Sequence, residues 1–218
     1  MAKLVIFGTG TFAKMAHWCF SRDSEHDVVG FTVNADRLTE ESYLGLPVYP
    51  FEEIERYCPP DTFSLFVAVG YSKMNAIRAA KCAEAKARGF ILPSYVSSRC
   101  TMLTDTPIGE NCCIFEDNTI QPFVTIGNGV MIWSGCHIGH EVVIGDYCFV
   151  SSHAVIAGHT KIGERCFVGI NATIHEYLTI APETLVGAGA VIAKDTVPQG
   201  VYVPPRSVLL ARSSDTFF

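Results

Sequence analysis

An aliphatic residue recurs at every sixth position through the C-terminal half of this 218-residue chain. Ile or Val occupies each position from Ile108 to Ile192 in steps of six, fifteen positions in succession. Small or apolar residues recur four places after many of them, among them Cys112, Cys148 and Ala190. A period of six fits neither the 3.6 residues of an α-helical turn nor the two of an isolated strand. It is the pattern of a parallel β-helix.

Three hexads form one triangular coil of such a helix. Residues 18 apart in the sequence are therefore expected to stack at about 4.8 Å, the spacing of neighbouring strands. Each coil can bury its aliphatic side chains only against the adjacent coils. This stacking rule assigns every side chain its neighbours by counting along the sequence. It places Gly158 above His140, for example, and Pro122 below it.

Residues 1–92 follow a different pattern, in which predicted strands and helices alternate. Apolar runs predict strands over 3–8, 27–33 and 64–70, and the segments over 9–20, 51–57 and 73–89 predict helices, the last stopped by Gly89. This order predicts a parallel sheet with helices on its faces, about half of a dinucleotide-binding fold. We therefore predict two domains, an α/β Rossmann-like half-domain at 1–92 and an all-β domain at 93–218.

Composition excludes several classes of protein. The net charge of −6 argues against a nucleic-acid binder. Residues 118–140 lack charged side chains, but Pro122 and the periodic glycines of this stretch argue against a membrane span. The N-terminal apolar run is too short for a signal peptide, which predicts a cytoplasmic location. The nine cysteines lack zinc-site spacing, so we expect reduced thiols and no disulfide framework.

A glycine-rich turn joins the first predicted strand to the first helix. The backbone N–H groups of such a turn can hold a phosphate at the helix N-terminus, although the same motif is also a simple tight turn. After the second strand, Asn34 and Asp36 could hydrogen-bond a base or ribose. Half a dinucleotide fold argues against nicotinamide chemistry. The candidate turn residues are Gly8, Gly10, Thr11, Phe12 and Ala13.

Five of the seven histidines lie between residues 137 and 175. Because His140 stacks beside a glycine, its imidazole has the open space that a substrate-accessible base needs, and the alternative is a plain exposed corner residue. Glu141 stacks beneath His159, which by itself predicts only a surface ion pair of little energetic value. His137 stacks between threonine and valine and is interpreted as structural or as a support of the base.

The hexads and five motifs together resemble a known family. In order these motifs are IFGTGTFAK, LGLPVYP, GHEVVIGD, FVGINATI and VGAGAVI, and they span nearly the whole chain. The chain resembles the left-handed β-helix sugar O-acyltransferases related to sialic-acid O-acetyltransferases, and most closely the nucleotide-sugar N-acetyltransferases of the bacillosamine type. The resemblance implies a left-handed β-helix, acetyl-CoA as donor and a nucleotide-linked amino-sugar as acceptor. It also implies a homotrimer with active sites between subunits, and a role in surface polysaccharide, lipopolysaccharide or O-antigen synthesis.

The resemblance also assigns roles to residues. It makes His140 the general base and Glu141 the acid that orients it. Some relatives have a second histidine nine residues after the base, where this chain has Phe149, so that role is not transferred and His153 is a weak substitute. The family's lysine position is Lys14. The remaining assignments are Gly70 and Tyr71 near the nucleotide-sugar phosphates, and Gly158, Ile170, Asn171 and Ala188 along coenzyme A.

Three alternatives share parts of this pattern. Zinc enzymes of the carbonic anhydrase type share the β-helix, but no two histidines here are 5 or 36 residues apart, and the histidine columns are expected to diverge. No metal is therefore predicted. An O-acetyltransferase acting on a sugar such as sialic acid would have the same architecture. A non-catalytic nucleotide-sugar-binding protein would bind ligand without thioester turnover. The nucleotide, the sugar and the carbon that is acylated stay open.

Overall fold

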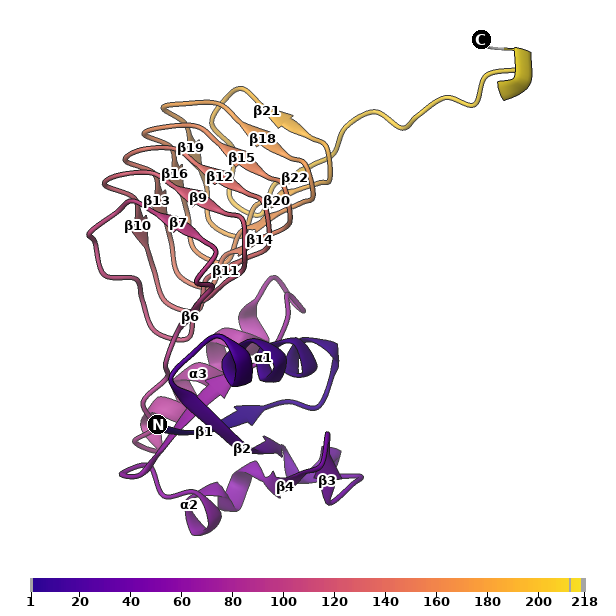
Figure 1. Cartoon of the computed structure of the whole chain (residues 1–218). Helices are drawn as coiled ribbons and strands as arrows, with labels where there is room; N and C mark the ends of the chain where they lie inside the picture. The colour runs from indigo at the N-terminus through magenta and orange to yellow at the C-terminus, as the bar shows by residue number, and fades with distance from the viewer. Residues whose placement is uncertain (1, 212, 217–218) are drawn as a thin grey trace.

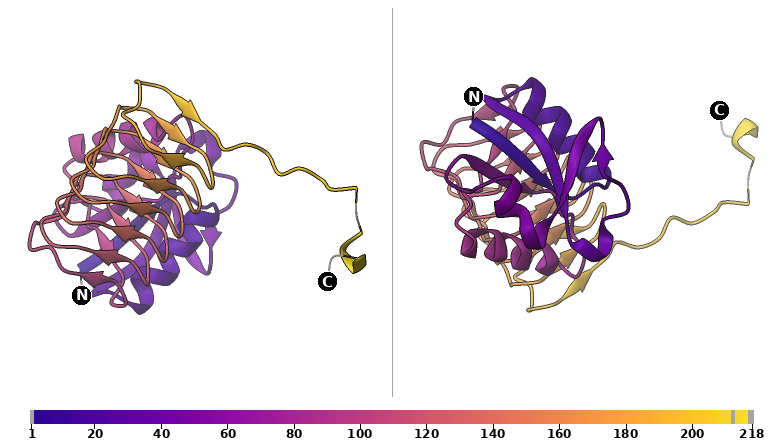
Figure 2. Two further views of the ribbon diagram at one scale, coloured as in Figure 1. Left: turned by 90° about the horizontal axis from the view of Figure 1, so that it is seen from above. Right: turned by 90° about the horizontal axis from the view of Figure 1, so that it is seen from below.

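The computed structural model of the chain describes residues 2–211 and 213–216. It consists of an α/β domain packed along one side of a β-helix, with a C-terminal segment extending from the last coil (Figure 1). Seen from above, the β-helix lies in front of the α/β domain, and seen from below the α/β domain lies in front of the β-helix (Figure 2). The parallel β-helix predicted from the hexads is confirmed, as are the left-handed β-helix fold that the resemblance implies and the α/β half-domain before it. The predicted boundary at 92/93 falls between α3, which ends at Ala87, and the first β-helix strand, which begins at Tyr95.

The α/β domain contains one five-stranded sheet. Its order is β3-β4-β2-β1-β5, parallel except for β3 at the edge. Side chains alternate across β1, so that Leu4 and Ile6 pack on one face with α1 while Val5 and Phe7 pack on the other with α2 and α3. The elements are β1 (Ala2–Phe7), α1 (Thr11–Arg22), β2 (His26–Val33), η1 (Ala35–Arg37), β3 (Ser42–Tyr43), β4 (Leu46–Pro50), η2 (Phe51–Glu53), α2 (Ile54–Tyr57), β5 (Phe63–Val67) and α3 (Ala76–Ala87).

The third predicted helix begins three residues later than expected. Lys73, Met74 and Asn75 have φ angles of 50°, 48° and 63°, so the chain makes a left-handed turn before α3 starts at Ala76. Non-glycine residues rarely adopt this conformation, and three in succession require outside support. The predicted stop is correct, because Gly89 follows the helix with a φ of 88°.

The β-helix consists of two-residue strands joined by turns, and each aliphatic of the hexad series from 114 to 192 is the second residue of its strand. Neighbouring strands pair in parallel with an offset of 18 residues over most of the helix, as His137 does with Thr119 and Val155. The stacking rule is thus confirmed. The seven-stranded sheet contains β6 (Tyr95–Val96), β8 (Cys113–Ile114), β11 (Met131–Ile132), β14 (Phe149–Val150), β17 (Phe167–Val168), β20 (Leu185–Val186) and β22 (Val201–Tyr202).

Two further sheets close the triangle. The six-stranded sheet contains β7 (Thr101–Met102), β9 (Thr119–Ile120), β12 (His137–Ile138), β15 (Val155–Ile156), β18 (Thr173–Ile174) and β21 (Val191–Ile192). The four-stranded sheet contains β10 (Thr125–Ile126), β13 (Val143–Ile144), β16 (Lys161–Ile162) and β19 (Thr179–Ile180). Because turns connect the sheets, every coil has three corners.

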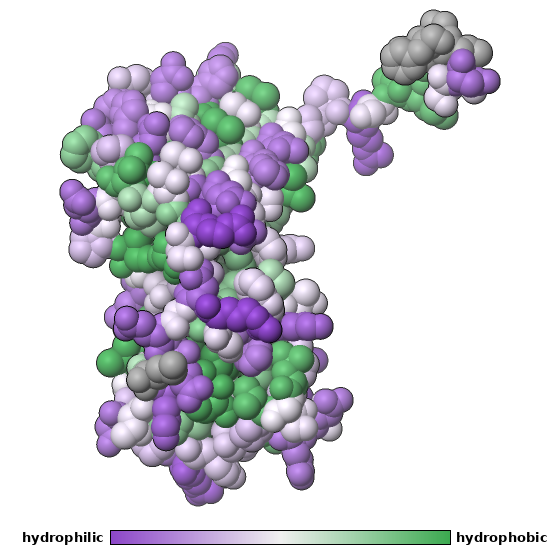
Figure 3. Space-filling model, viewed as in Figure 1, coloured by the Kyte–Doolittle hydropathy of each residue, from purple (hydrophilic) through white to green (hydrophobic). Residues whose placement is uncertain are grey.

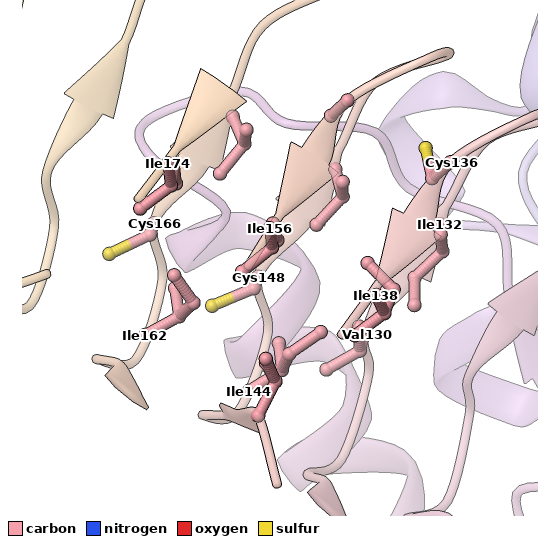
Figure 4. Close-up of a cluster of buried hydrophobic side chains, with 14 of the residues drawn as sticks. Val130, Ile132, Cys136, Ile138, Ile144, Cys148, Ile156, Ile162, Cys166 and Ile174 are labelled. Carbon is pink, nitrogen blue, oxygen red and sulfur yellow. The ribbon is translucent and has the colours of Figure 1, made fainter. Parts of the chain in front are cut away.

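The interior of the β-helix is a column of aliphatic and cysteine side chains (Figure 4). Cys136, Cys148 and Cys166 occupy inward positions, and their thiols contact carbonyl oxygens fifteen residues further on, at 3.0–3.2 Å. All nine cysteines are free, as expected. Burial raises the pKa of Cys136 to about 11, so its thiol stays protonated at neutral pH. These cysteines therefore act as small core residues.

One buried arginine joins the two domains. Arg78 of α3 is fully buried, and its guanidinium donates hydrogen bonds to carbonyl oxygens on both sides of the interface. Two acceptors, Val69 and Gly70, precede the left-handed turn, and three belong to β-helix turns: Gly129, Tyr147 and Cys148. Burial lowers the pKa of Arg78 to about 10, which still leaves it charged at neutral pH. Carbonyl dipoles thus stabilise this charge.

After Pro205 the chain extends away from the last coil and ends, as far as it is described, in η3 (Ser214–Thr216). Val208, Leu209 and Leu210 are exposed in this segment, Leu209 to 96%. Figure 3 shows hydrophobic atoms on this segment, away from the body of the molecule. No helix in the described part of the chain has the length and apolar character that a membrane span needs.

Replacing Arg78 with Met should destabilise the protein strongly. The change removes the donor of four carbonyl oxygens, since only that of Cys148 keeps another donor, the N–H of Met131. We expect a loss of about 3–5 kcal/mol in the free energy of unfolding. Lys86 is the matched control, because it also joins α3 to a β-helix turn, through Glu110, but at an exposed position. Lys86→Met should cost less than about 1 kcal/mol. Urea denaturation measures both values, and equal losses would contradict the role given to Arg78.

Candidate functional site

Two places on the β-helix hold the predicted catalytic and coenzyme residues. The first, here called the base corner, consists of His140, Glu141, Gly158 and His159 in the turns that follow β12 and β15. The second, here called the aromatic pocket, is a cavity of about 410 Å³ between the loop before α3 and the seven-stranded sheet. Its lining residues are Tyr71, Trp133, Phe149, Ser151, Ser152, Phe167, Gly169, Ile170 and Ala188.

At the base corner the imidazole of His140 lies against the backbone of Gly158. A Cβ atom on Gly158 would come within 2.9 Å of His140 Cε1 and Nε2. The backbone N–H of His140 is fixed by the side-chain oxygen of Gln121 at 2.9 Å. The residue itself is exposed to solvent. The stacking rule therefore located the glycine correctly, and the space that it leaves is where the His140 ring rests.

The carboxylate beside His140 pairs with His159, the partner that the stacking rule predicts, rather than with His140, the partner that the resemblance implies. Glu141 Oε2 lies 2.8 Å from Nδ1 of His159, whose ring stacks on Tyr177 at 4.5 Å between centroids. His159 also meets the His140 ring edge-on at 4.9 Å. The expectation that the histidine columns diverge is wrong here, because one nitrogen from each of the two imidazoles and one oxygen of Glu141 lie within 4.8 Å of one another. The sequence indicated His159 only as a surface partner of Glu141.

The other histidines lie elsewhere. His137 is paired between Thr119 and Val155 in the six-stranded sheet and is exposed. His153 is at another corner of the coil, where its ring lies against Gly135. Phe149, at the position of the second histidine of some relatives, lines the aromatic pocket. Of these three residues, only His137 adjoins the base corner, through the strand that leads into it.

The aromatic pocket is built from one column of the seven-stranded sheet. Phe149 and Phe167 stack one coil apart, with ring centroids 5.4 Å apart and planes within 8° of parallel. Tyr71 lies edge-on to both rings at 5.1 Å. Trp133 completes the wall, and its buried indole Nε1 has no hydrogen-bond partner among the described residues. Ile170 and Ala188, predicted to contact coenzyme A, also line this pocket.

The loop that carries Tyr71 is held from both sides. Arg78 donates to Gly70 at its start, at 2.8 Å. At its end the Asn75 amide donates to the carbonyl oxygens of Arg165 and Cys166. These bonds support the left-handed turn between them and keep Tyr71 on the β-helix. Tyr71 therefore lines the aromatic pocket, although it belongs to the α/β domain.

The base corner and the aromatic pocket lie at different corners of the same coil. Ser152 of the pocket and Gly158 of the base corner are six residues apart, at successive turns, a span of up to about 20 Å of extended chain. Asn171 adjoins the pocket, in the turn that follows β17. The predicted coenzyme residues are therefore divided, with Ile170, Asn171 and Ala188 at one corner and Gly158 at the other.

The predicted nucleotide residues surround the start of α1. Gly8 has a φ of 118°, and a Cβ there would come within 3.1 Å of the Ala68 carbonyl oxygen, so glycine is required. Gly10 precedes the helix, and its carbonyl oxygen accepts the first hydrogen bond of the helix, from the N–H of Lys14. The N–H groups of the first turn are thus left for a ligand. That turn consists of Thr11, Phe12 and Ala13, with Lys14 exposed beside it.

A second cavity of about 150 Å³ lies beside this turn. Thr9, Arg37 and Tyr43 line it; Thr9 belongs to the glycine-rich motif, whereas no motif indicated Arg37 or Tyr43. Asn34 follows β2 nearby but accepts a hydrogen bond from Lys81 at 3.0 Å, and exposed Asp36 pairs with its neighbour Arg37. The lining residues come from segments with no fixed spacing, so only the fold brings them together.

The chain is similar to known transferases. Residues 105–140 and 123–158 match the family model described as bacterial transferase hexapeptide (six repeats). No curated protein matches the chain. Among solved structures, the acetyltransferase domain of PglB from Neisseria gonorrhoeae is 25% identical with a TM-score of 0.78, over 94% of this chain and 100% of that one. That domain has also been solved in complex with acetyl coenzyme A.

Two further structures share the fold. PerB from Caulobacter crescentus, solved with CoA and GDP-perosamine, is 26% identical with a TM-score of 0.75, over 89% of this chain and 90% of that one. WeeI from Acinetobacter baumannii is 21% identical with a TM-score of 0.77, over 91% and 94% of the two chains. The resemblance seen in the sequence is confirmed. The chain has the hexapeptide repeats and two-domain architecture of the left-handed β-helix nucleotide-sugar acetyltransferases.

Replacing Gly158 with Ala should displace the His140 ring without unfolding the protein. The backbone of Gly158 is not in the left-handed region, and its nearest neighbours are atoms of one exposed side chain. We expect the imidazole resonances of His140 to move in an NMR spectrum while those of His137 stay in place. The displaced rotamer should cost about 0.5–1.5 kcal/mol. Unchanged His140 resonances would contradict the contact.

Proposed function

We propose that the protein is an acetyl-CoA-dependent N-acetyltransferase that acts on the amino group of a nucleotide-linked amino-sugar. One observation carries the proposal: the similarity to structures solved with acetyl coenzyme A, and with CoA and GDP-perosamine, extends over both domains rather than the β-helix alone. A β-helix by itself would support many functions. The preceding domain adds the glycine turn and the small cavity that a nucleotide requires.

In this reaction the sugar amine attacks the thioester carbonyl of acetyl-CoA. A C–N bond forms, the C–S bond breaks, and the proton lost by the amine passes to His140 and then to the departing thiolate. A positioned histidine contributes roughly 10²–10⁴-fold to such a step. Backbone N–H groups of the turns would hold the carbonyl oxygen as it gains charge. Glu141 pairs with His159, whose ring meets that of His140 edge-on, and would thereby help to position the base.

The division of the site between two corners supports an assembly in which copies of the chain complete each other. An amine and a thioester must meet within about 3–3.5 Å to react, but the base and the pocket of one copy lie at successive corners of the coil. We propose a trimer in which the base corner of one copy faces the aromatic pocket of the next. Ile170, Asn171 and Ala188 would then bind coenzyme A from one side, and Gly158 with His140 from the other.

The rest of the assignment follows from this proposal. The glycine turn with Lys14 would hold the diphosphate, and Asn34 or Asp36 the nucleoside. Tyr71 would lie between nucleotide and thioester. Acetyl-CoA and nucleotide-sugars are cytoplasmic metabolites, so a cytoplasmic location stays our prediction, as does a role in surface polysaccharide synthesis.

Thiol release tests the proposed function directly. The full chain is incubated with acetyl-CoA and a panel of UDP-, dTDP- and GDP-linked amino-sugars, and free coenzyme A is measured. We expect release with at least one amino-sugar, and none with the matching sugar that carries a hydroxyl in place of the amine. Release only with the hydroxyl sugar would replace this proposal with O-acetylation. Binding without release would make the protein a non-catalytic binder.

His140→Ala should lower kcat by about 10²–10⁴-fold while the melting temperature changes little, because the side chain is exposed and supplies a proton acceptor rather than packing. His137→Asn is the matched control, another exposed histidine three residues away, and should cost less than about tenfold. Steady-state kinetics measure both. The opposite ranking would show that His137 is the base.

Gly10→Leu should raise KM for the nucleotide-sugar and leave acetyl-CoA binding nearly intact. No atom lies within 4 Å of a Cβ at this position and its backbone is extended, so the variant should fold, but the side chain would occupy the approach of a phosphate. Calorimetric titration measures the affinity of the variant for each of the two ligands. Equal weakening of both would mean that the first domain is not a separate nucleotide site.

A further inference from the structure

Three side chains of the base corner form a group that is arranged like metal ligands. His140, Glu141 and His159, here called the corner triad, offer two imidazole nitrogens and a carboxylate oxygen that all lie within 4.8 Å of one another. No other group of three potential ligands this close occurs in the described part of the chain. Sequence spacing argues against a zinc site of the carbonic anhydrase type, but this triad has a different spacing.

The backbone holds the triad in place. Glu141 and His159 occupy the same left-handed position at one corner of two successive coils, with φ angles of 58° and 60°. The N–H of His159 donates to the carbonyl oxygen of His140 at 3.0 Å, which locks the two turns together. Tyr177 supports one face of the His159 ring, and Gly158 supports the His140 ring. Coil stacking therefore fixes the backbone of the three ligands, which do not lie on a flexible loop.

The chemistry of the triad suits a divalent ion of borderline softness. Two imidazoles and one carboxylate are a common ligand set for Zn²⁺. Zn–ligand bonds of about 2.0–2.1 Å place tetrahedral ligand atoms roughly 3.4 Å apart, so the widest pair needs to close by about 1.4 Å. Exposed side chains can do this by small rotations, since 50% of the Glu141 side chain and 29% of that of His159 are accessible. The same exposure leaves a fourth position open to water.

We propose that the corner triad binds one Zn²⁺ ion per chain, with His140, Glu141 and His159 as the protein ligands. The ion would lie between Glu141 and His159, and it would take up the lone pair of His140. Zn²⁺ therefore inhibits the transferase by occupying its base. The inhibition rests on the proposed function, whereas the binding does not.

Equilibrium dialysis of the full chain against Zn²⁺, with the metal content measured per chain, tests the binding. We expect one ion per chain, and an affinity about tenfold or more weaker in His159→Gln and in Glu141→Gln, since each removes one ligand. His137→Asn, which removes a nearby exposed histidine outside the triad, should bind like the unmodified protein. Undiminished binding in His159→Gln would overturn the site.

The chain also has nine cysteines, which could bind the metal instead. Co²⁺ substitution distinguishes the two, because its visible spectrum depends on the type of ligand. We expect weak visible bands of nitrogen and oxygen ligation that disappear in Glu141→Gln. Intense thiolate charge-transfer bands would place the metal on cysteines and overturn the proposal. In the thiol-release assay, His159→Gln should need about tenfold more Zn²⁺ for half-inhibition. Absent turnover in the unmodified protein would count against the proposed function, while dialysis would still decide the metal site.

Discussion

Stacking of one coil on the next is the interaction on which the rest of this structure depends. Each coil buries its aliphatic column only against its neighbours, so the hexad series fixes which turn lies above which. That register places Gly158 against His140 and His159 against Glu141. It also stacks Phe149 on Phe167 in the aromatic pocket. A one-coil slip would separate all three pairs, and for that reason the functional groups sit on rigid turns rather than on long loops.

The second constraint is the fixed position of the first domain. A Rossmann-like half-domain on a linker would place its nucleotide anywhere relative to the β-helix. Here a fully buried guanidinium from α3 is bound to three β-helix carbonyl oxygens and to two in the loop before Tyr71. Asn75 adds two more bonds to the β-helix, which supports a turn with three successive left-handed residues. The cost of that turn is offset by contacts that fix the position of the α/β domain relative to the aromatic pocket.

The periodic parts of the molecule were predictable, and the contacts between segments without a period were not. The hexads specified strands, register, inward cysteines and the neighbours of His140, because residues 18 apart in the sequence stack on one another in adjacent coils. Nothing in the spacing indicated that Arg78, in an amphipathic helix rich in Lys and Arg, would be buried, or that Tyr71 would lie on β-helix aromatics. Glu141 was assigned to His140 by resemblance, but its nearest partner is His159, the residue one coil away that the stacking rule names. The small cavity beside Thr9 and Tyr43 depends on the order of the sheet strands, which the sequence did not specify.

The central claim is that the base of one copy serves the pocket of another, and subunit complementation tests it most directly. His140→Ala removes the base, and Ala188→Trp fills the pocket at an exposed position. Each variant alone should be nearly inactive. Co-expressed in equal amounts, they should regain about a quarter of the unmodified activity, because each site then has one chance in two of receiving each intact half. A mixture as inactive as its components would contradict the account and place base and pocket of the same chain in one site.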